Sequence, residues 1–127
     1  MTIIYGQVEG LYKALEDLKK QPQSFTVARK LKDVFDAVNK EREFCSQQVK
    51  GLVETYGKKD EKGALLVNES GGYCLEDGAA FSEKFGELLS TNTGEIPALS
   101  EEMLKNFTIS AEQLDSLMLI MEVSSDG

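Results

Sequence analysis

Apolar residues recur along most of this chain at steps of three and four, which is the spacing that one face of an α-helix produces. The first such segment runs from Gln7 to about Lys20, and Pro22 follows it. Its apolar positions are Val8, Leu11, Tyr12, Leu15 and Leu18. Because proline cannot continue a helix, this segment predicts an amphipathic helix that ends before Pro22.

The second segment, residues 25–56, is longer; it has no proline, and its only glycine is Gly51. Ser24 is suited to cap its first turn, and Gly57 follows where a glycine in the left-handed conformation often ends a helix. One stripe keeps steps of four and three throughout. It consists of Leu31, Phe35, Val38, Arg42, Cys45, Val49, Leu52 and Tyr56.

A helix over residues 25–56 would be about 48 Å long at 1.5 Å per residue. A compact domain of this size is narrower, roughly twice a radius of gyration of about 14 Å. The helix must therefore bend, or something other than the first helix must cover its ends. We expect self-association along the stripe from Leu31 to Tyr56, with a dimer as the simplest form.

The segments 64–68 and 73–76 flank a glycine-rich turn and predict a small β-hairpin after a charged turn at 58–63. The expected fold is therefore α+β and mainly α. We expect a single domain over residues 1–127, in which a helical hairpin (1–57) precedes an acidic part (58–127) made of the β-hairpin and two to three short helices.

Those short helices are predicted from their caps as well as from their apolar spacing. Asp77 can cap a helix over about 79–90, and Ser100 a single turn that ends near Lys105. Ser110 and Gln113 form a capping-box pair for a last helix over about 111–122.

The net charge of −8 argues against non-specific nucleic-acid binding, which needs basic residues to neutralise phosphates. The charge is unevenly distributed. Residues 1–62 carry twelve basic and ten acidic residues, a net of +2, whereas residues 63–127 carry two and twelve, a net of −10. An acidic surface of this kind could fill a basic cleft on a partner.

A basic cluster surrounds the turn between the first two predicted helices. It consists of Lys19, Lys20, Arg29, Lys30 and Lys32. These residues could simply be solvated helix ends. Alternatively, they form a docking site for an anion or an acidic partner, including the acidic half of another copy.

Arg42 interrupts the apolar stripe of the long helix and leaves two alternatives open. Its stem could cover apolar neighbours while the guanidinium reaches solvent. Alternatively, it pairs with a carboxylate from the acidic half or from a second subunit, because a buried arginine needs a partner.

The chain contains no histidine, which excludes Ser-His-Asp and Cys-His catalysis and imidazole metal ligands. Cys45 and Cys74 form no CxxC motif, and two reduced, buried thiols are expected. No glycine-rich phosphate loop occurs, and the acidic pairs are adjacent in sequence, so they do not share a helix face. We therefore expect no catalytic residue, no cofactor and no metal site, and a carboxylate-and-metal enzyme is the least favoured hypothesis.

The N-terminus lacks the pattern of a signal peptide, and no segment approaches the roughly 20 apolar residues that span a bilayer. These features predict a cytoplasmic protein without a membrane partner.

Two segments carry a resemblance to a known family. ETYGKKDEKG (54–63) resembles the family pattern KYG-x-KDE-x-G, and FGELLSTNTGEIP (85–97) is similar to its ELL-x-x-E-x-x-x-x-IP stretch. The family comprises small phage and prophage proteins of unknown function from Gram-positive bacteria and their phages. The resemblance covers about residues 8–122 and implies a phage-encoded accessory protein, in the infected cell or on the virion. It brings no catalytic residues.

Two functions follow as hypotheses. The first is a non-enzymatic, homo-oligomeric accessory protein, such as an assembly or tail-associated factor, which the long apolar stripe favours. The alternative is an inhibitor of host takeover or defence that binds a host protein through its acidic half. Such an inhibitor could instead sequester a signalling nucleotide, for which only the basic cluster could supply the cations.

Overall fold

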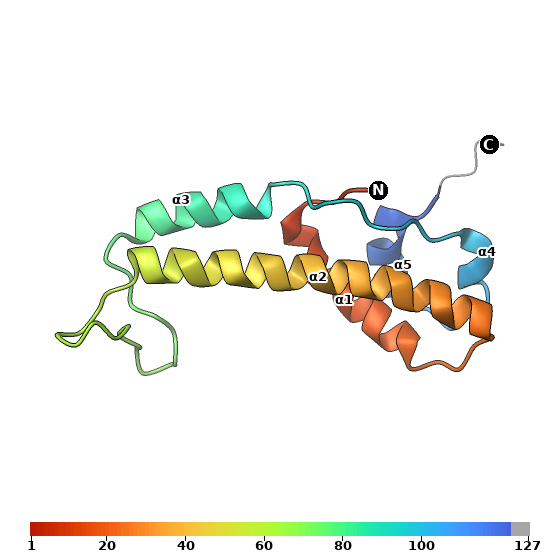
Figure 1. The fold of residues 1–127 in the computed structure, drawn as a ribbon, viewed down its shortest axis with the longest axis horizontal. Helices are drawn as coiled ribbons and strands as arrows, with labels where there is room; N and C mark the ends of the chain where they lie inside the picture. Colours follow the sequence, from red (N-terminus) through yellow and green to blue (C-terminus); the bar gives the residue numbers. More distant parts are fainter. Residues whose placement is uncertain (123–127) are drawn as a thin grey trace.

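The long apolar stripe belongs to one continuous helix, α2 (Phe25–Tyr56), which runs along most of the long axis of the molecule (Figure 1). The computed structural model describes residues 1–122. Ser24 caps α2 as predicted, its side chain accepting a hydrogen bond from the Val27 amide at 3.4 Å. The other elements are α1 (Tyr5–Lys19), α3 (Gly78–Leu89), α4 (Glu101–Leu104), α5 (Ala111–Leu117) and a 3-10 turn, η1 (Met118–Ile120).

Three further caps confirm their predictions. The side chains of Asp77, Ser100 and Ser110 accept hydrogen bonds from the first turns of α3, α4 and α5, and Gln113 completes the capping box of α5. The last helix is shorter than expected, because it gives way to the 3-10 turn after Leu117.

The hydrophobic core lies around the N-terminal half of α2. There α1 runs antiparallel to α2, and the C-terminal segment with α4 and α5 closes the other sides (Figure 1). The completely buried side chains of this region include Leu11, Leu15, Leu18, Val34, Val38, Leu99, Leu117 and Ile120. We call this half the core.

The C-terminal half of α2 extends beyond the core, and α3 returns antiparallel along it (Figure 1). We call residues 39–56 of α2 together with α3 the arm. Within the arm only Val53 is buried, and α3 contains no buried residue. The ends of the long helix are therefore covered by other segments of the same chain, and the cover is thin in the arm.

The predicted β-hairpin is wrong, and with it the α+β class: the part of the chain that the structure describes is helical and has no strand or sheet. Residues 57–76 form only isolated antiparallel bridges, among them Val67 with Tyr73 and Lys59 with Leu65. The backbone of Lys58 explains why no regular hairpin forms. Its N–H donates to the Cys74 carbonyl, and its carbonyl accepts from the Leu66 amide. The backbone hydrogen bonds are thus divided among three short segments, around Lys58, Leu66 and Cys74.

Side chains in the same loop also take up backbone donors. Asn68 Oδ1 accepts from the amides of Ser70 and Gly72, and Asp60 Oδ1 accepts from those of Lys62 and Ala64. Such local hydrogen bonds compete with a regular ladder. The loop therefore consists of turns where alternating strands were expected.

Gly57 ends α2, but in an extended conformation (φ −77°, ψ 145°), so the expected left-handed cap is also wrong. The glycine is required for space, because a Cβ atom there would clash with the Val53 carbonyl oxygen and would lie 2.7 Å from Leu65 Cδ2. This close approach lets the chain turn sharply out of the helix.

Candidate binding groove

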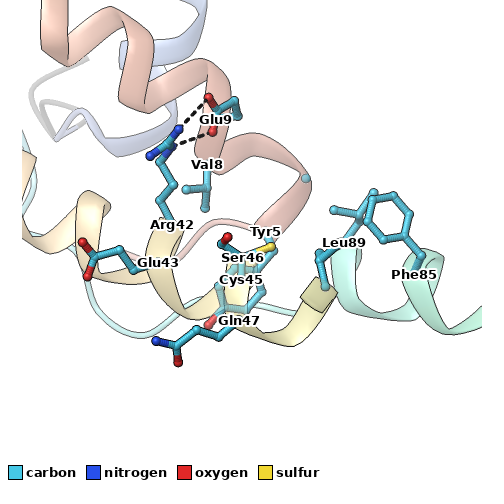
Figure 2. A pocket seen from close by; sticks show the side chains of 12 residues that line it. Tyr5, Val8, Glu9, Arg42, Glu43, Cys45, Ser46, Gln47, Phe85 and Leu89 are labelled. Atoms are coloured by element: carbon cyan, nitrogen blue, oxygen red, sulfur yellow. Dashed lines mark hydrogen bonds and ion pairs between the residues drawn. The ribbon is translucent and has the colours of Figure 1, made fainter. Parts of the chain in front are cut away.

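A groove of about 530 Å³ opens where the core meets the arm. The start of α1, the end of α3 and the interval from Arg42 to Val49 of α2 meet here, and residues of all three helices line the groove. Figure 2 shows this interval crossing the groove, with Phe85 and Leu89 of α3 at one end and Glu9 of α1 near the other. A volume of this order is typical of ligand or side-chain binding pockets.

Arg42 and Glu9 form one rim of the groove. Arg42 Nε donates to Glu9 Oε2 at 2.8 Å, and Nη2 donates to Oε1 at 3.5 Å (Figure 2). The hydrogen bond to Glu9 raises the pKa of Arg42 above its ordinary value. Arg42 therefore pairs with a carboxylate, but the carboxylate belongs to α1 and not to the acidic half or to a second subunit.

Aromatic rings continue this rim along the seam between α1 and α2. The Arg42 guanidinium lies 4.2 Å from the centre of the Tyr12 ring, which packs against Phe35 with centroids 5.2 Å apart. At the far end Lys19 Nζ lies 3.9 Å from the Phe35 ring centre. Both cations are thereby held against aromatic faces, an attractive arrangement that also fixes the register of the two helices.

Tyr5 fixes the position of the groove relative to the core. Its hydroxyl donates to Glu41 Oε2 at 2.7 Å, while Glu41 Oε1 accepts from the Gly94 amide at 3.1 Å. Burial of the phenol, with the hydrogen bond and charge of Glu41, raises the pKa of Tyr5 to about 12. One carboxylate thus ties the start of α1 and the segment after α3 to the middle of α2.

Cys45 lies half-buried in the groove (Figure 2). Burial, with a smaller contribution from the charge of Glu9, raises the pKa of its thiol. At neutral pH the side chain is therefore a neutral, weakly nucleophilic thiol. Cys74 is also a free thiol and lies half-buried in the loop 57–76, so neither is as deeply buried as the sequence suggested.

The self-association stripe is divided between different surroundings. Leu31, Phe35 and Val38 lie in the core beneath α1, so they are not accessible to a partner. The other members remain half-exposed. Arg42, Cys45 and Val49 line the groove, and Leu52 and Tyr56 lie farther along the arm.

The basic cluster does not converge on a pocket. Besides Lys19 on Phe35, Lys20 pairs with Asp17 at 3.8 Å and Lys32 with Asp36 at 2.6 Å. Arg29 and Lys30 are exposed, and within residues 1–122 they form no ion pair. The groove lies at the middle of α2, away from this turn.

Several groove residues had no sequence signal of their own. Four of them are ordinary polar positions on predicted helices: Glu9, Glu43, Ser46 and Gln47. Two others, Phe85 and Leu89, belong to the apolar face of a short helix. They come together only because of where α1 begins and α3 ends on α2. Residues 1–122 contain no cluster of three or more Cys, Asp and Glu side chains able to hold a metal ion.

No helix in the described residues is both long enough and apolar enough to cross a membrane. Comparison of the chain with models of protein families, with curated proteins and with solved structures gives no match. The resemblance to phage and prophage proteins stays a prediction.

Proposed function

We propose that the protein is a non-enzymatic binding protein that associates with a second copy of itself through the arm and its groove. One observation carries the proposal: α3 has no buried residue, although it packs along α2. A twelve-residue helix is marginal in water and depends on packing for its stability. A second arm would supply the packing that α3 lacks.

The apolar side chains of the arm are suited to this role. Phe81 and Phe85 of α3 stack with ring centroids 5.7 Å apart, and both stay half-buried. On α2, Val49, Leu52 and Tyr56 continue the steps of three and four that favour helix-to-helix packing. Two such arms together would make a four-helix arrangement, the usual way in which helix pairs complete a core.

Homo-oligomers with two-fold symmetry are the commonest assemblies of proteins. A self-associating, non-catalytic protein agrees with the role of a phage-encoded accessory or assembly factor that the sequence resemblance implies. We include that role in the proposal.

Sedimentation velocity or light scattering over a concentration series tests self-association. We expect a dimer that dissociates on dilution in the micromolar range, and a protein that stays monomeric at about 100 µM would contradict the proposal. Ser46→Arg, at the mouth of the groove, should weaken the dimer at least about tenfold.

Gln48→Arg is the matched control. Gln48 is exposed on the same helix two residues away, but it does not line the groove. Both variants change the net charge equally, so a difference between them reports position and not charge. Equal weakening by both would argue against the groove as the contact.

A further inference from the structure

The exposed side of α2 beside the groove carries a charge pattern with its own symmetry. Four residues spaced i, i+3, i+4 and i+7 share one face of the helix: Glu43, Ser46, Gln47 and Lys50. All four side chains are exposed, and the first three line the groove. This face is therefore free to meet another molecule along the length of the groove.

Glu43 and Lys50 lie at equal distances, about 5 Å along the helix axis, from the midpoint between Ser46 and Gln47. Lys50 forms no ion pair within residues 1–122, and Glu43 accepts only a long hydrogen bond from Asn39, at 3.4 Å. Farther out, Asn39 and Glu54 are also equidistant from the same midpoint. The face thus has opposite or complementary groups at its two ends.

Such a face is complementary to itself in one orientation only. If two copies lie antiparallel, each Glu43 faces the Lys50 of the other copy, and each Asn39 amide faces a Glu54 carboxylate. If they lie parallel and in register, Glu43 faces Glu43 and Lys50 faces Lys50. Like charges across an interface cost free energy, so the pattern selects the antiparallel pair.

We propose that two copies of this chain pair antiparallel across the face of Glu43, Ser46, Gln47 and Lys50, with a two-fold axis between Ser46 and Gln47. This inference rests on the self-association proposed above and specifies its geometry. The α2 helix of the partner lies over the mouth of the groove and removes Cys45 and Val49 from water. The short side chain of Ser46 at the axis lets the two helices approach closely.

Charge reversal in three preparations tests the geometry. Glu43→Lys alone and Lys50→Glu alone each place like charges across both ends of the dimer, so each should weaken it about tenfold or more. An equimolar mixture of the two variants restores complementary pairs at both ends. The mixture should therefore form heterodimers with a dissociation constant within about threefold of the wild-type value.

Sedimentation velocity with one variant fluorescently labelled measures all three. Restoration in the mixture supports the antiparallel pair and cannot come from unfolding, since each variant alone would still carry its defect. A wild-type dimer that neither substitution weakens, or a mixture no tighter than its components, overturns this geometry and leaves self-association intact. A wild-type monomer at about 100 µM overturns both proposals.

Discussion

The two halves of α2 have the same apolar spacing and very different surroundings. In the core, the stripe is covered by α1 and the C-terminal segment, and Val34 and Val38 are completely buried. In the arm, Arg42 pairs with Glu9 of α1, the rest of the stripe runs beside α3, and none of its residues is buried. Equal patterns along one helix can therefore form the core at one end and stay half-exposed at the other.

The largest difference between the two halves should come from matched leucine truncations. Leu15→Ala removes a completely buried side chain from the core and should lower the free energy of unfolding by about 3 kcal/mol. Leu52→Ala, in the arm, should cost about 1 kcal/mol because its side chain is only half-buried. Urea denaturation measures both, and losses of equal size would mean that the arm is packed as firmly as the core.

Hydrogen exchange should resolve the same contrast without a substitution. The amides of α3 should open with a free energy about 2 kcal/mol below that of the α1 amides, because no buried side chain holds α3 in place. Protection of α3 should rise with protein concentration as the dimer forms. Uniform protection of α1 and α3 in a dilute sample would remove the distinction between core and arm.

Tyr5 joins the two halves, and its titration reports on that junction. Tyr5→Phe removes the hydrogen bond to Glu41 and should cost about 1 kcal/mol at neutral pH. Folding raises the pKa of Tyr5 from 10.0 to about 12, so the neutral phenol is the form that the fold favours. Its contribution is complete below pH 10 and is lost as the pH rises through about 12.

Denaturation at a series of pH values compares the wild type with Tyr5→Phe. The stability gap between them should be constant below pH 10 and should narrow above it. Tyr73→Phe, at an exposed position in the loop, serves as the control and should leave stability at neutral pH unchanged. A stability gap that does not depend on pH would argue against the partly buried hydrogen bond between Tyr5 and Glu41.

The smallest effect is expected at Gly51, in the part of α2 that belongs to the arm. It is exposed, and a Cβ atom there would meet no other atom within 4 Å. Gly51→Ala should therefore raise stability by up to about 1 kcal/mol through helix propensity alone. Thermal unfolding measures the gain, and a loss of stability would indicate a contact at Gly51 that the monomer does not have.

Local chemistry was predictable from this sequence, and long-range placement was not. Ser24, Asp77, Ser100 and Ser110 cap the helices that their hydroxyl and carboxylate groups predicted, since a cap depends on residues three positions away. The prediction of a β-hairpin was wrong because the backbone of Lys58, outside the two expected strands, forms hydrogen bonds with both of them. Apolar spacing carries no information about such a third segment.

The groove was beyond prediction for a related reason. The stripe predicted an apolar surface on α2, but which part of it stays open depends on where α1 begins and α3 ends. For Arg42, one alternative was a carboxylate of the acidic half or of a second subunit, but the partner in the structure is Glu9 of α1, a residue with nothing to distinguish it in the sequence. Pairing across helices is decided by register, and register follows from packing.

The unbroken length of α2 sets the distance between the two ends of a dimer as well as supporting the fold of each copy. In an antiparallel pair centred between Ser46 and Gln47, the two Phe25 ends would point in opposite directions, about 65 Å apart at 1.5 Å per residue. Phe25 is 78% exposed and lies beside the basic cluster, so each end presents the same surface outward. The assembly would then be bivalent, and a target that repeats at a matching interval would be held by avidity even if each single contact were weak.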